Sequence, residues 1–254
     1  MKIRALLIVA LVTPLLSAHT LAPQRIARAD DSPLLPISDN LFTFARVQFN
    51  SRGRMGGGRR RRGGGPGWAH DYPRAERNFL NILAELTTVR TAPESYVIVQ
   101  LEDPEIMRYP FLYFSEPGTW EITPEETANL KEYLDRGGFA IFDDFGGGRD
   151  WAVFHQNFKS VVPDRDLELL TVDDPIFHCF FDIETLAMGV RQGSRQRPQF
   201  FGLRDEQGRL QMIVNFNNDL GDYWEWSDAG LFPLSLSNEA YKFGVNYVVY
   251  SLTH

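Results

Sequence analysis

The stretch GGFAIFDDFGGG, residues 137–148, joins an apolar strand at 139–142 to two adjacent carboxylates, Asp143 and Asp144, and then to a glycine turn. Residues 123–136 before it begin with the Thr and Glu spacing of a capping box and end at glycine, which predicts a helix. Because ligands of open α/β sheets bind outside the carboxyl ends of the strands, this polar tip is our first candidate for a site.

Apolar periodicity on both sides of this unit predicts the rest of the fold. Strands that alternate with helices indicate an α/β fold with a mostly parallel sheet, helices on both faces and a late antiparallel hairpin. Residues 217–236 have no clear period and are expected to form a long loop. We expect strands at 41–49, 96–101 and 109–114, helices at 73–87, 124–136, 151–161 and 238–252, and a hairpin of 200–204 with 209–216.

The N-terminal segment has the composition of a secretory signal. Basic residues precede an apolar run at 5–16, which is too short to span a bilayer as a helix, and small residues suit cleavage after Ala29. We therefore expect a signal peptide at 1–29, with an uncleaved anchor through 5–16 as the alternative, a linker at 30–40, and one α/β domain at 41–252. The predicted location is periplasmic or secreted.

Charge separates the domain from one loop. Residues 1–29 hold four basic and no acidic residues, so the remaining chain has 33 acids, 22 bases and a net charge of −11, which argues against nucleic-acid binding. The exception is the Gly/Arg stretch 52–67, which we expect to be disordered. Its residues Arg59, Arg60, Arg61 and Arg62 suit contact with a membrane surface, although a tolerated surface insertion is the interpretation we favour.

The Asp143–Asp144 pair supports two functional interpretations. It can supply oxygen ligands to a divalent cation or a general base, and we name both residues as catalytic and ligand-binding candidates. Neighbouring residues of a strand point to opposite faces, so the carboxylates converge only if the turn begins between them. The structural alternative is that Asp144 or Asp150 caps the following helix.

A second polar group, WAHDYP at 68–73, follows the first strand. Histidine, aspartate and tyrosine transfer protons or bind ligands, and tryptophan stacks on them. His70 is therefore a catalytic candidate, and Trp68, Asp71 and Tyr72 are ligand-binding candidates. The structural alternative is a helix entrance, with Asp71 as the cap and Trp68 over the core.

A third polar group, residues 215–226, mixes amides and carboxylates with aromatic rings. It lacks the register of a calcium loop, so a metal there is only weakly indicated. We take Asn218 and Asp219 from it as ligand-binding candidates, together with Glu116 after the strand at 109–114. No dedicated metal site and no cofactor are predicted, with a divalent cation left open.

Cys179 is the only cysteine, so no intramolecular disulfide can form. Its apolar neighbours favour an inert core residue over a thiol nucleophile, although His178 lies beside it in sequence. The chain has no G-x-S-x-G, phosphate-loop, HExxH or CxxC motif.

Seven pieces of the sequence together resemble the uncharacterised DUF4159 family, and they extend over 41–252. They are FTFAR (42–46), W-x-x-DYP (68–73), YPFLY (109–113), LKEYLDRGG (130–138), FDD (142–144), NDLG (218–221) and GVN (244–246). The resemblance implies a flavodoxin-like sheet related to that of class I glutamine amidotransferases, with no established activity.

The resemblance also bears on mechanism. Amidotransferases carry a cysteine at the turn after a central strand, where this chain has Asp143 and Asp144, so thioester hydrolysis of glutamine is not expected. The family often has Asp-His-Pro where this chain has Asp174 before Pro175, which weakens a catalytic histidine there. Larger members of the family look like parts of cell-envelope assemblies, which implies a cell-envelope protein partner.

We therefore expect an exported binding or assembly domain with an amidotransferase-like cleft that lacks the nucleophilic cysteine. The alternative is a hydrolase or lyase in which Asp143 or Asp144 acts as a base or metal ligand and His70 or Tyr72 acts as the acid. Whether the chain is an enzyme stays open, a classical glutamine amidotransferase is disfavoured, and the oligomeric state is not predicted.

Overall fold

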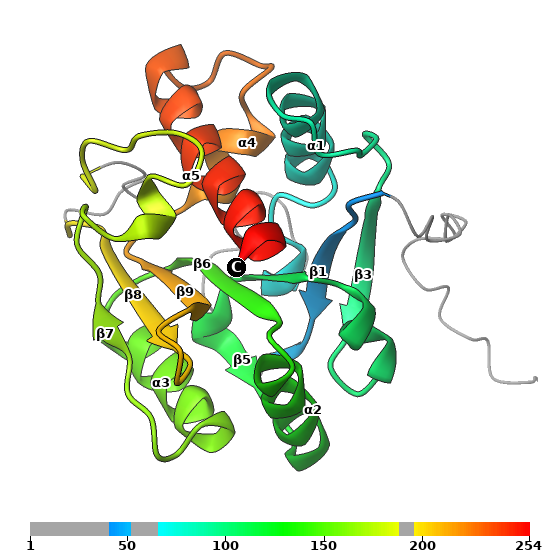
Figure 1. Cartoon of the computed structure of the whole chain (residues 1–254), viewed down its shortest axis with the longest axis vertical. Helices are drawn as coiled ribbons and strands as arrows, with labels where there is room; N and C mark the ends of the chain where they lie inside the picture. The colour runs from blue at the N-terminus through cyan, green and yellow to red at the C-terminus, as the bar shows by residue number, and fades with distance from the viewer. Residues whose placement is uncertain (1–40, 52–65, 188–195) are drawn as a thin grey trace, which may run out of the picture. The chain divides into compact units, whose positions relative to one another are not determined.

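The computed structural model describes residues 41–51, 66–187 and 196–254. Within them a seven-stranded sheet has the order β3-β1-β4-β6-β9-β8-β7 (Figure 1). The first five strands in that order are parallel, and β8 and β7 continue the sheet antiparallel. Their bounds are β3 Tyr96–Gln100, β1 Phe44–Gln48, β4 Phe111–Ser115, β6 Phe139–Phe145, β9 Leu210–Phe216, β8 Gln199–Arg204 and β7 Glu168–Leu169.

This architecture confirms the predicted α/β class, the mostly parallel sheet and the late hairpin, and it is consistent with a flavodoxin-like layout. Two short strands, β2 (Asn50–Ser51) and β5 (Trp120–Glu121), form a separate antiparallel pair. The predicted signal segment 1–29, the linker 30–40 and the arginines of the 52–67 loop lie outside the described residues.

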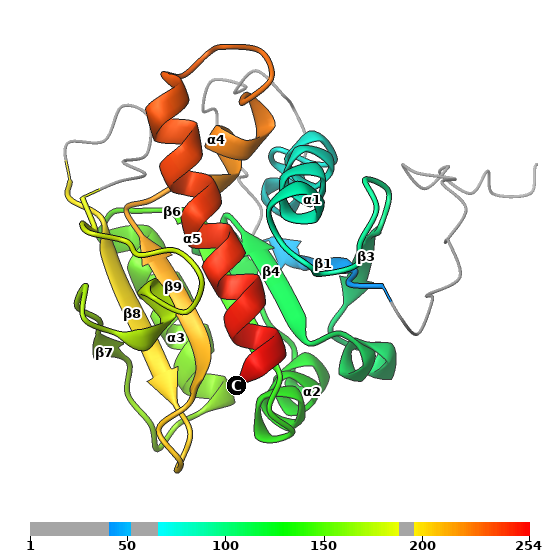
Figure 2. The same ribbon diagram turned by 45° about the horizontal axis from the view of Figure 1, so that its top comes forward.

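Helices cover both faces of the sheet, as Figure 2 shows for the face crossed by α5. On that face α1 (Arg74–Leu86), α4 (Leu220–Glu225) and α5 (Leu234–Thr253) bury one apolar cluster. On the other face α2 (Pro124–Asp135) and α3 (Gly148–Val161) bury a second cluster. Because strand side chains alternate, each central strand contributes to both clusters.

Local sequence explains the helix that precedes β6. The Thr123 side chain accepts a hydrogen bond from the Glu126 backbone N–H at 3.2 Å, and Glu126 Oε2 accepts one from the Thr123 N–H at 2.6 Å. This confirms the capping box, which is typically worth about 1 kcal/mol. Gly137 then takes a φ of 89°, a left-handed conformation that ends α2 at little cost.

Several predicted details are wrong. The strand expected at 139–142 continues to Phe145, and α3 begins after Gly147 without a side-chain cap, so neither Asp144 nor Asp150 caps it. Pro73 stands at the N-cap position of α1, and the helix has no side-chain cap, which removes the capping interpretation of Asp71.

The predicted loop 217–236 contains a helix, α4, whose first turn is capped by Asp219. The last helix begins four residues earlier than expected, directly after Pro233. Among the described residues, no helix is both long enough and apolar enough to cross a membrane.

Candidate functional site

A bulge in β6 brings the two adjacent carboxylates to one side of the sheet. The register against β9 shifts between Phe142 and Phe145, and Asp144 has a φ of 56°. Both phenylalanines pack in the cluster under α2 and α3, although they are three residues apart. Because of the extra residue, Asp143 and Asp144 both lie toward the opposite face of the sheet. In a regular strand, two neighbouring residues would point to different faces.

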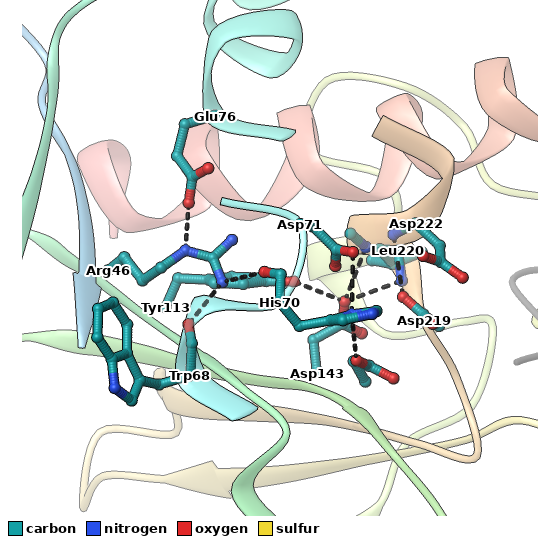
Figure 3. A network of polar contacts seen from close by, with 12 residues as sticks. Arg46, Trp68, His70, Asp71, Glu76, Tyr113, Asp143, Asp219, Leu220 and Asp222 are labelled. Atoms are coloured by element: carbon teal, nitrogen blue, oxygen red, sulfur yellow. Dashed lines mark hydrogen bonds and ion pairs between the residues drawn. The ribbon is translucent and has the colours of Figure 1, made fainter. Parts of the chain in front are cut away.

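Asp143 is fully buried and held by four hydrogen bonds. Its Oδ2 accepts from the Tyr113 hydroxyl at 2.8 Å and from the backbone N–H groups of Leu220 at 2.8 Å and Gly221 at 3.2 Å (Figure 3). Its Oδ1 accepts from the side-chain amide of Asn215 at 3.1 Å. Asp143 thus joins β4, β6, β9 and the start of α4, which is a structural role.

Asp144 instead contacts the loop that follows β1. Nδ1 of His70 lies 3.0 Å from Asp144 Oδ2 and 2.9 Å from Asp71 Oδ1. Both carboxylate side chains are buried, while the His70 side chain is 32% exposed, so the imidazole is the part of this group that reaches solvent. Asp71 in that loop has a φ of 66°, a left-handed conformation.

Further carboxylates surround this contact. Ligand atoms of Asp71, Asp144 and Asp219 all lie within 4.8 Å of one another, and all three residues are buried. Asp219 Oδ1 also accepts the Asp222 N–H at 3.0 Å, which fixes its position at the first turn of α4. We use the name acidic pocket for this cluster of the His70, Asp71, Asp144 and Asp219 side chains.

Two more acids lie at the edge of the acidic pocket. Glu116 has a ligand atom within 4.8 Å of those of His70 and Asp144, and Asp222 has one within 4.8 Å of those of His70 and Asp71. The pocket lies at the carboxyl ends of β4, β6 and β9, where open α/β sheets place their ligands.

Burial and like charge dominate the electrostatics of the acidic pocket. Desolvation and the Asp144 charge raise the pKa of Asp71, and desolvation with the charges of Asp144 and Asp71 raises that of Asp219. The carboxylates of Asp144 and Asp71 raise the pKa of His70 to about 11. Burial raises the pKa of Asp143 to about 6, although its hydrogen bonds act in the opposite direction. The site therefore favours any added positive charge.

A buried ion pair supports the loop that carries His70 and Asp71. The guanidinium of Arg46 on β1 contacts the carboxylate of Glu76 on α1, and both side chains are fully buried. Its Nη1 donates to the carbonyls of Trp68 at 3.0 Å and His70 at 2.9 Å (Figure 3). The guanidinium carbon also lies 5.0 Å from the ring centre of Tyr113.

Sequence reasoning missed this support, although a signal was present. Arg46 stands within the apolar strand FTFARVQF, where a cation needs a buried acceptor, and Glu76 lies on the inner face of the next helix. Nothing in the sequence spacing pointed to Tyr113 or Asn215 as partners of Asp143.

Of the predicted site residues, His70, Asp71, Asp144, Asp219 and Glu116 are brought together, with Asp143 beneath them. Trp68 and Tyr72 are not part of this group. The Trp68 side chain packs against the cluster under α2 and α3, and the Tyr72 ring lies edge-on to Tyr96. Asn218 is buried, and its Oδ1 accepts the Asp219 N–H at 2.8 Å.

Cys179 lies away from the acidic pocket. Its thiol donates to the carbonyl of Asn246 on α5 at 3.2 Å, and burial raises the pKa of the thiol to about 11. A thiol with such a pKa is almost entirely protonated near neutral pH, which suits the predicted inert residue. The neighbouring His178 pairs with Asp182 at 3.1 Å on the surface.

Comparison with protein families gives one match that covers most of the chain. The model described as "Domain of unknown function (DUF4159)" matches residues 43–252, a range that contains the acidic pocket, Asp143 and the Arg46–Glu76 pair. No match was found among curated proteins. The resemblance seen in the sequence pieces is thereby confirmed, and the chain belongs to the DUF4159 family.

Proposed function

We propose that this domain binds a cationic ligand in the acidic pocket. The observation that carries the proposal is the convergence of three buried carboxylates, Asp71, Asp144 and Asp219, within 4.8 Å. The imidazole of His70 contacts two of them. A single imidazolium cannot balance three carboxylates, so this buried group has an excess of negative charge.

Excess buried charge of one sign is costly, because like charges repel and the protein interior solvates them poorly. The group can lower this cost by taking up protons, which the raised pKa values of Asp71 and Asp219 reflect. It can also do so by binding a cation, since the His70 side chain is partly exposed to solvent.

Cation binding is better supported than a hydrolase or lyase in which Asp143 acts as the catalytic base. Both oxygens of Asp143 are occupied by donors from Tyr113, Asn215 and the start of α4, so this carboxylate is not placed to accept a substrate proton. An enzyme built on this site would have to use Asp144 with His70.

We also propose, on the sequence alone, that the domain is exported to the periplasm or outside the cell and that a cell-envelope protein is its partner. The charged and apolar pattern of residues 1–29 supports export. The family resemblance supports the partner. Fractionation of cells that express the full chain tests the first part, and capture from envelope extracts tests the second.

Thermal unfolding with a panel of cations tests the binding proposal. The panel contains Mn²⁺, Zn²⁺, Mg²⁺, Ca²⁺ and the organic amine putrescine. A ligand of the native state at 100 times its Kd stabilises the fold by about 2.7 kcal/mol, which shifts the midpoint by several degrees. We expect at least one cation to raise the midpoint, and Asp144→Asn and Asp219→Asn to remove the rise.

The matched control is Asp182→Asn, which alters an exposed carboxylate that also pairs with a histidine ring. It should leave the cation effect unchanged. If no cation in the panel raises the midpoint of the unaltered protein, the proposed function is wrong.

A further inference from the structure

The contacts of His70 in the acidic pocket are not those of an ordinary hydrogen-bonded imidazole. Nδ1 lies 2.9 Å from Asp71 Oδ1 and 3.0 Å from Asp144 Oδ2, yet neither contact has hydrogen-bond geometry. A ring nitrogen carries at most one proton and directs it along one line. The single Nδ1 proton can therefore be directed at Asp71 Oδ1 or at Asp144 Oδ2, but not at both in good hydrogen-bond geometry.

Asp71 gives a second indication. Its side chain is fully buried, and no N–H or O–H group of the described residues donates to either oxygen in ordinary geometry, so its partners are the His70 imidazole and the carboxyl of Glu225. Buried carboxylate oxygens are normally hydrogen-bonded, and the exceptions need an explanation such as an ion. The carboxylate of Asp71 faces those of Asp144 and Asp219, within 4.8 Å.

The two Nδ1 distances are those of an ordinary hydrogen bond and also those between ligands that share one metal ion. Nitrogen and oxygen ligands of zinc or magnesium lie about 2.1 Å from the ion. Neighbouring ligands are then about 3.0 Å apart in octahedral geometry and about 3.4 Å apart in tetrahedral geometry. The 2.9 Å and 3.0 Å contacts of Nδ1 agree with octahedral edges.

The donor set indicates which metals suit the site. Calcium takes six to eight oxygen ligands, and magnesium is held by carboxylates and water, whereas imidazole suits first-row transition ions and zinc. One imidazole nitrogen with two or three carboxylates is a mixed set that fits Mn²⁺ or Zn²⁺.

We infer that the cation of the acidic pocket is a divalent transition-type metal ion, Mn²⁺ or Zn²⁺, held by His70 Nδ1, Asp71 and Asp144 with Asp219 beside them. Binding releases to solvent the proton that Nδ1 carries beside these carboxylates, because a metal ligand must be deprotonated. This inference rests on the proposed function and narrows it, because an organic amine would satisfy the charge of the pocket without using the imidazole nitrogen. Asp143 is not a ligand, since its oxygens are already occupied by four donors.

Calorimetric titration of the full-length protein with MnCl₂ and ZnCl₂ tests the inference. We expect one site, and we expect His70→Gln and Asp144→Asn to weaken affinity by at least about tenfold, because even groups that only hydrogen-bond to metal ligands contribute about tenfold to a hundredfold. The matched control is His178→Gln, which removes a surface histidine that also pairs with an aspartate through Nδ1. It should change neither stoichiometry nor affinity.

Electron spin echo spectroscopy of the Mn²⁺-loaded protein separates a ligand from a merely structural histidine. We expect a coupling from a directly bound ¹⁴N nucleus, and its loss in His70→Gln. The unfolding midpoint of that variant without metal shows whether it still folds, and Asp144→Asn, which keeps the imidazole, provides a second variant.

The outcomes distinguish the inference from the proposed function. If putrescine raises the unfolding midpoint through Asp144 while Mn²⁺ and Zn²⁺ do not bind, the function stands and the metal inference is overturned. Tighter binding of Ca²⁺ than of Mn²⁺, or a Mn²⁺ site without nitrogen coupling, also overturns it. Binding of no cation at all overturns both.

Discussion

Two buried charged groups lie side by side in this domain and differ in their balance. In the first, Arg46 and Glu76 are one cation and one anion, and Arg46 also donates to two backbone carbonyls. In the second, the acidic pocket, carboxylates outnumber the single imidazole. The side chains of Arg46 and Glu76 are buried, and so are the carboxylates of Asp71, Asp144 and Asp219, so burial alone does not separate the two groups.

The difference in balance indicates different purposes. In a matched ion pair, the two charges balance each other within the protein, so removal of one partner should destabilise the fold. In an unmatched group, a bound ligand must supply the balancing charge. Removal of one of its carboxylates should therefore weaken binding and leave the stability of the fold unchanged or increased. Single substitutions on either side of this comparison can break it.

The largest expected effect is that of Glu76→Ala. The substitution leaves the guanidinium of Arg46 buried without its carboxylate, which typically costs about 3–5 kcal/mol. Urea unfolding monitored by fluorescence measures the loss. Glu85→Ala, on the exposed side of the same helix, is the control and should change stability little. A loss below about 1 kcal/mol for Glu76→Ala would mean that Arg46 is balanced by other groups.

The next effect separates two neighbours, Asp143 and Asp144. We expect Asp143→Asn to destabilise the fold by about 2–4 kcal/mol, because the amide has one acceptor oxygen instead of two, so at least one of the four donors to Asp143 must face its NH2 group. Asp144→Asn should change stability by less than about 1 kcal/mol, because asparagine tolerates the left-handed backbone and one repelling charge is removed.

Urea unfolding and cation titration of the same two variants provide the check. Asp144→Asn should lose cation binding while it keeps stability, and Asp143→Asn should lose stability first. Equal losses of stability in both variants would contradict the division of roles between these two carboxylates.

The sequence predicted the class of the fold because that information is local. The capping box before β6 and the hairpin of β8 with β9 are each encoded in short segments, and each was confirmed. Helix α4 was missed because its six residues are too few for a helical period, and its stability depends on packing and on the Asp219 cap.

The candidate site was predicted in position but not in detail. Asp144, His70 and Asp71 were named from strand ends and turns, and the parallel sheet brings those ends together. The separate roles of Asp143 and Asp144 depend on a bulge of one residue and on partners from β4 and β9. Such partners are distant in sequence, and no local pattern encodes them.

A smaller effect is expected at Gly221, which lies close to the carboxylates of both Asp71 and Asp143. A Cβ added to Gly221 would lie 2.4 Å from Asp71 Oδ2, and the Gly221 N–H donates to Asp143. We expect Gly221→Ala to cost about 1–3 kcal/mol through overpacking and to weaken cation binding by displacing Asp71. Gly148→Ala, where a Cβ meets no atom within 4 Å, is the matched control. Unchanged cation affinity in Gly221→Ala would show that the position of Asp71 is not critical.

The smallest effect is expected at an exposed ion pair, which isolates the contribution of burial to the comparison. Lys131 and Asp135 are one helical turn apart on α2, with Nζ and Oδ2 2.5 Å apart and both side chains about half exposed. Such a pair is worth about 0.3–0.5 kcal/mol, and the negative charge of Asp135 lies unfavourably at the helix C-terminus, so the two effects of Asp135→Asn nearly cancel. Urea unfolding in low salt and in 1 M NaCl should give a difference from the unaltered protein that is close to zero in both.

The loss caused by Glu76→Ala should persist in high salt, because ions do not screen a buried pair effectively. If Asp135→Asn proved as damaging as Glu76→Ala, pairing rather than burial would set the stability of charged groups in this fold, and the excess of carboxylates in the acidic pocket would lose its meaning as a sign of a ligand.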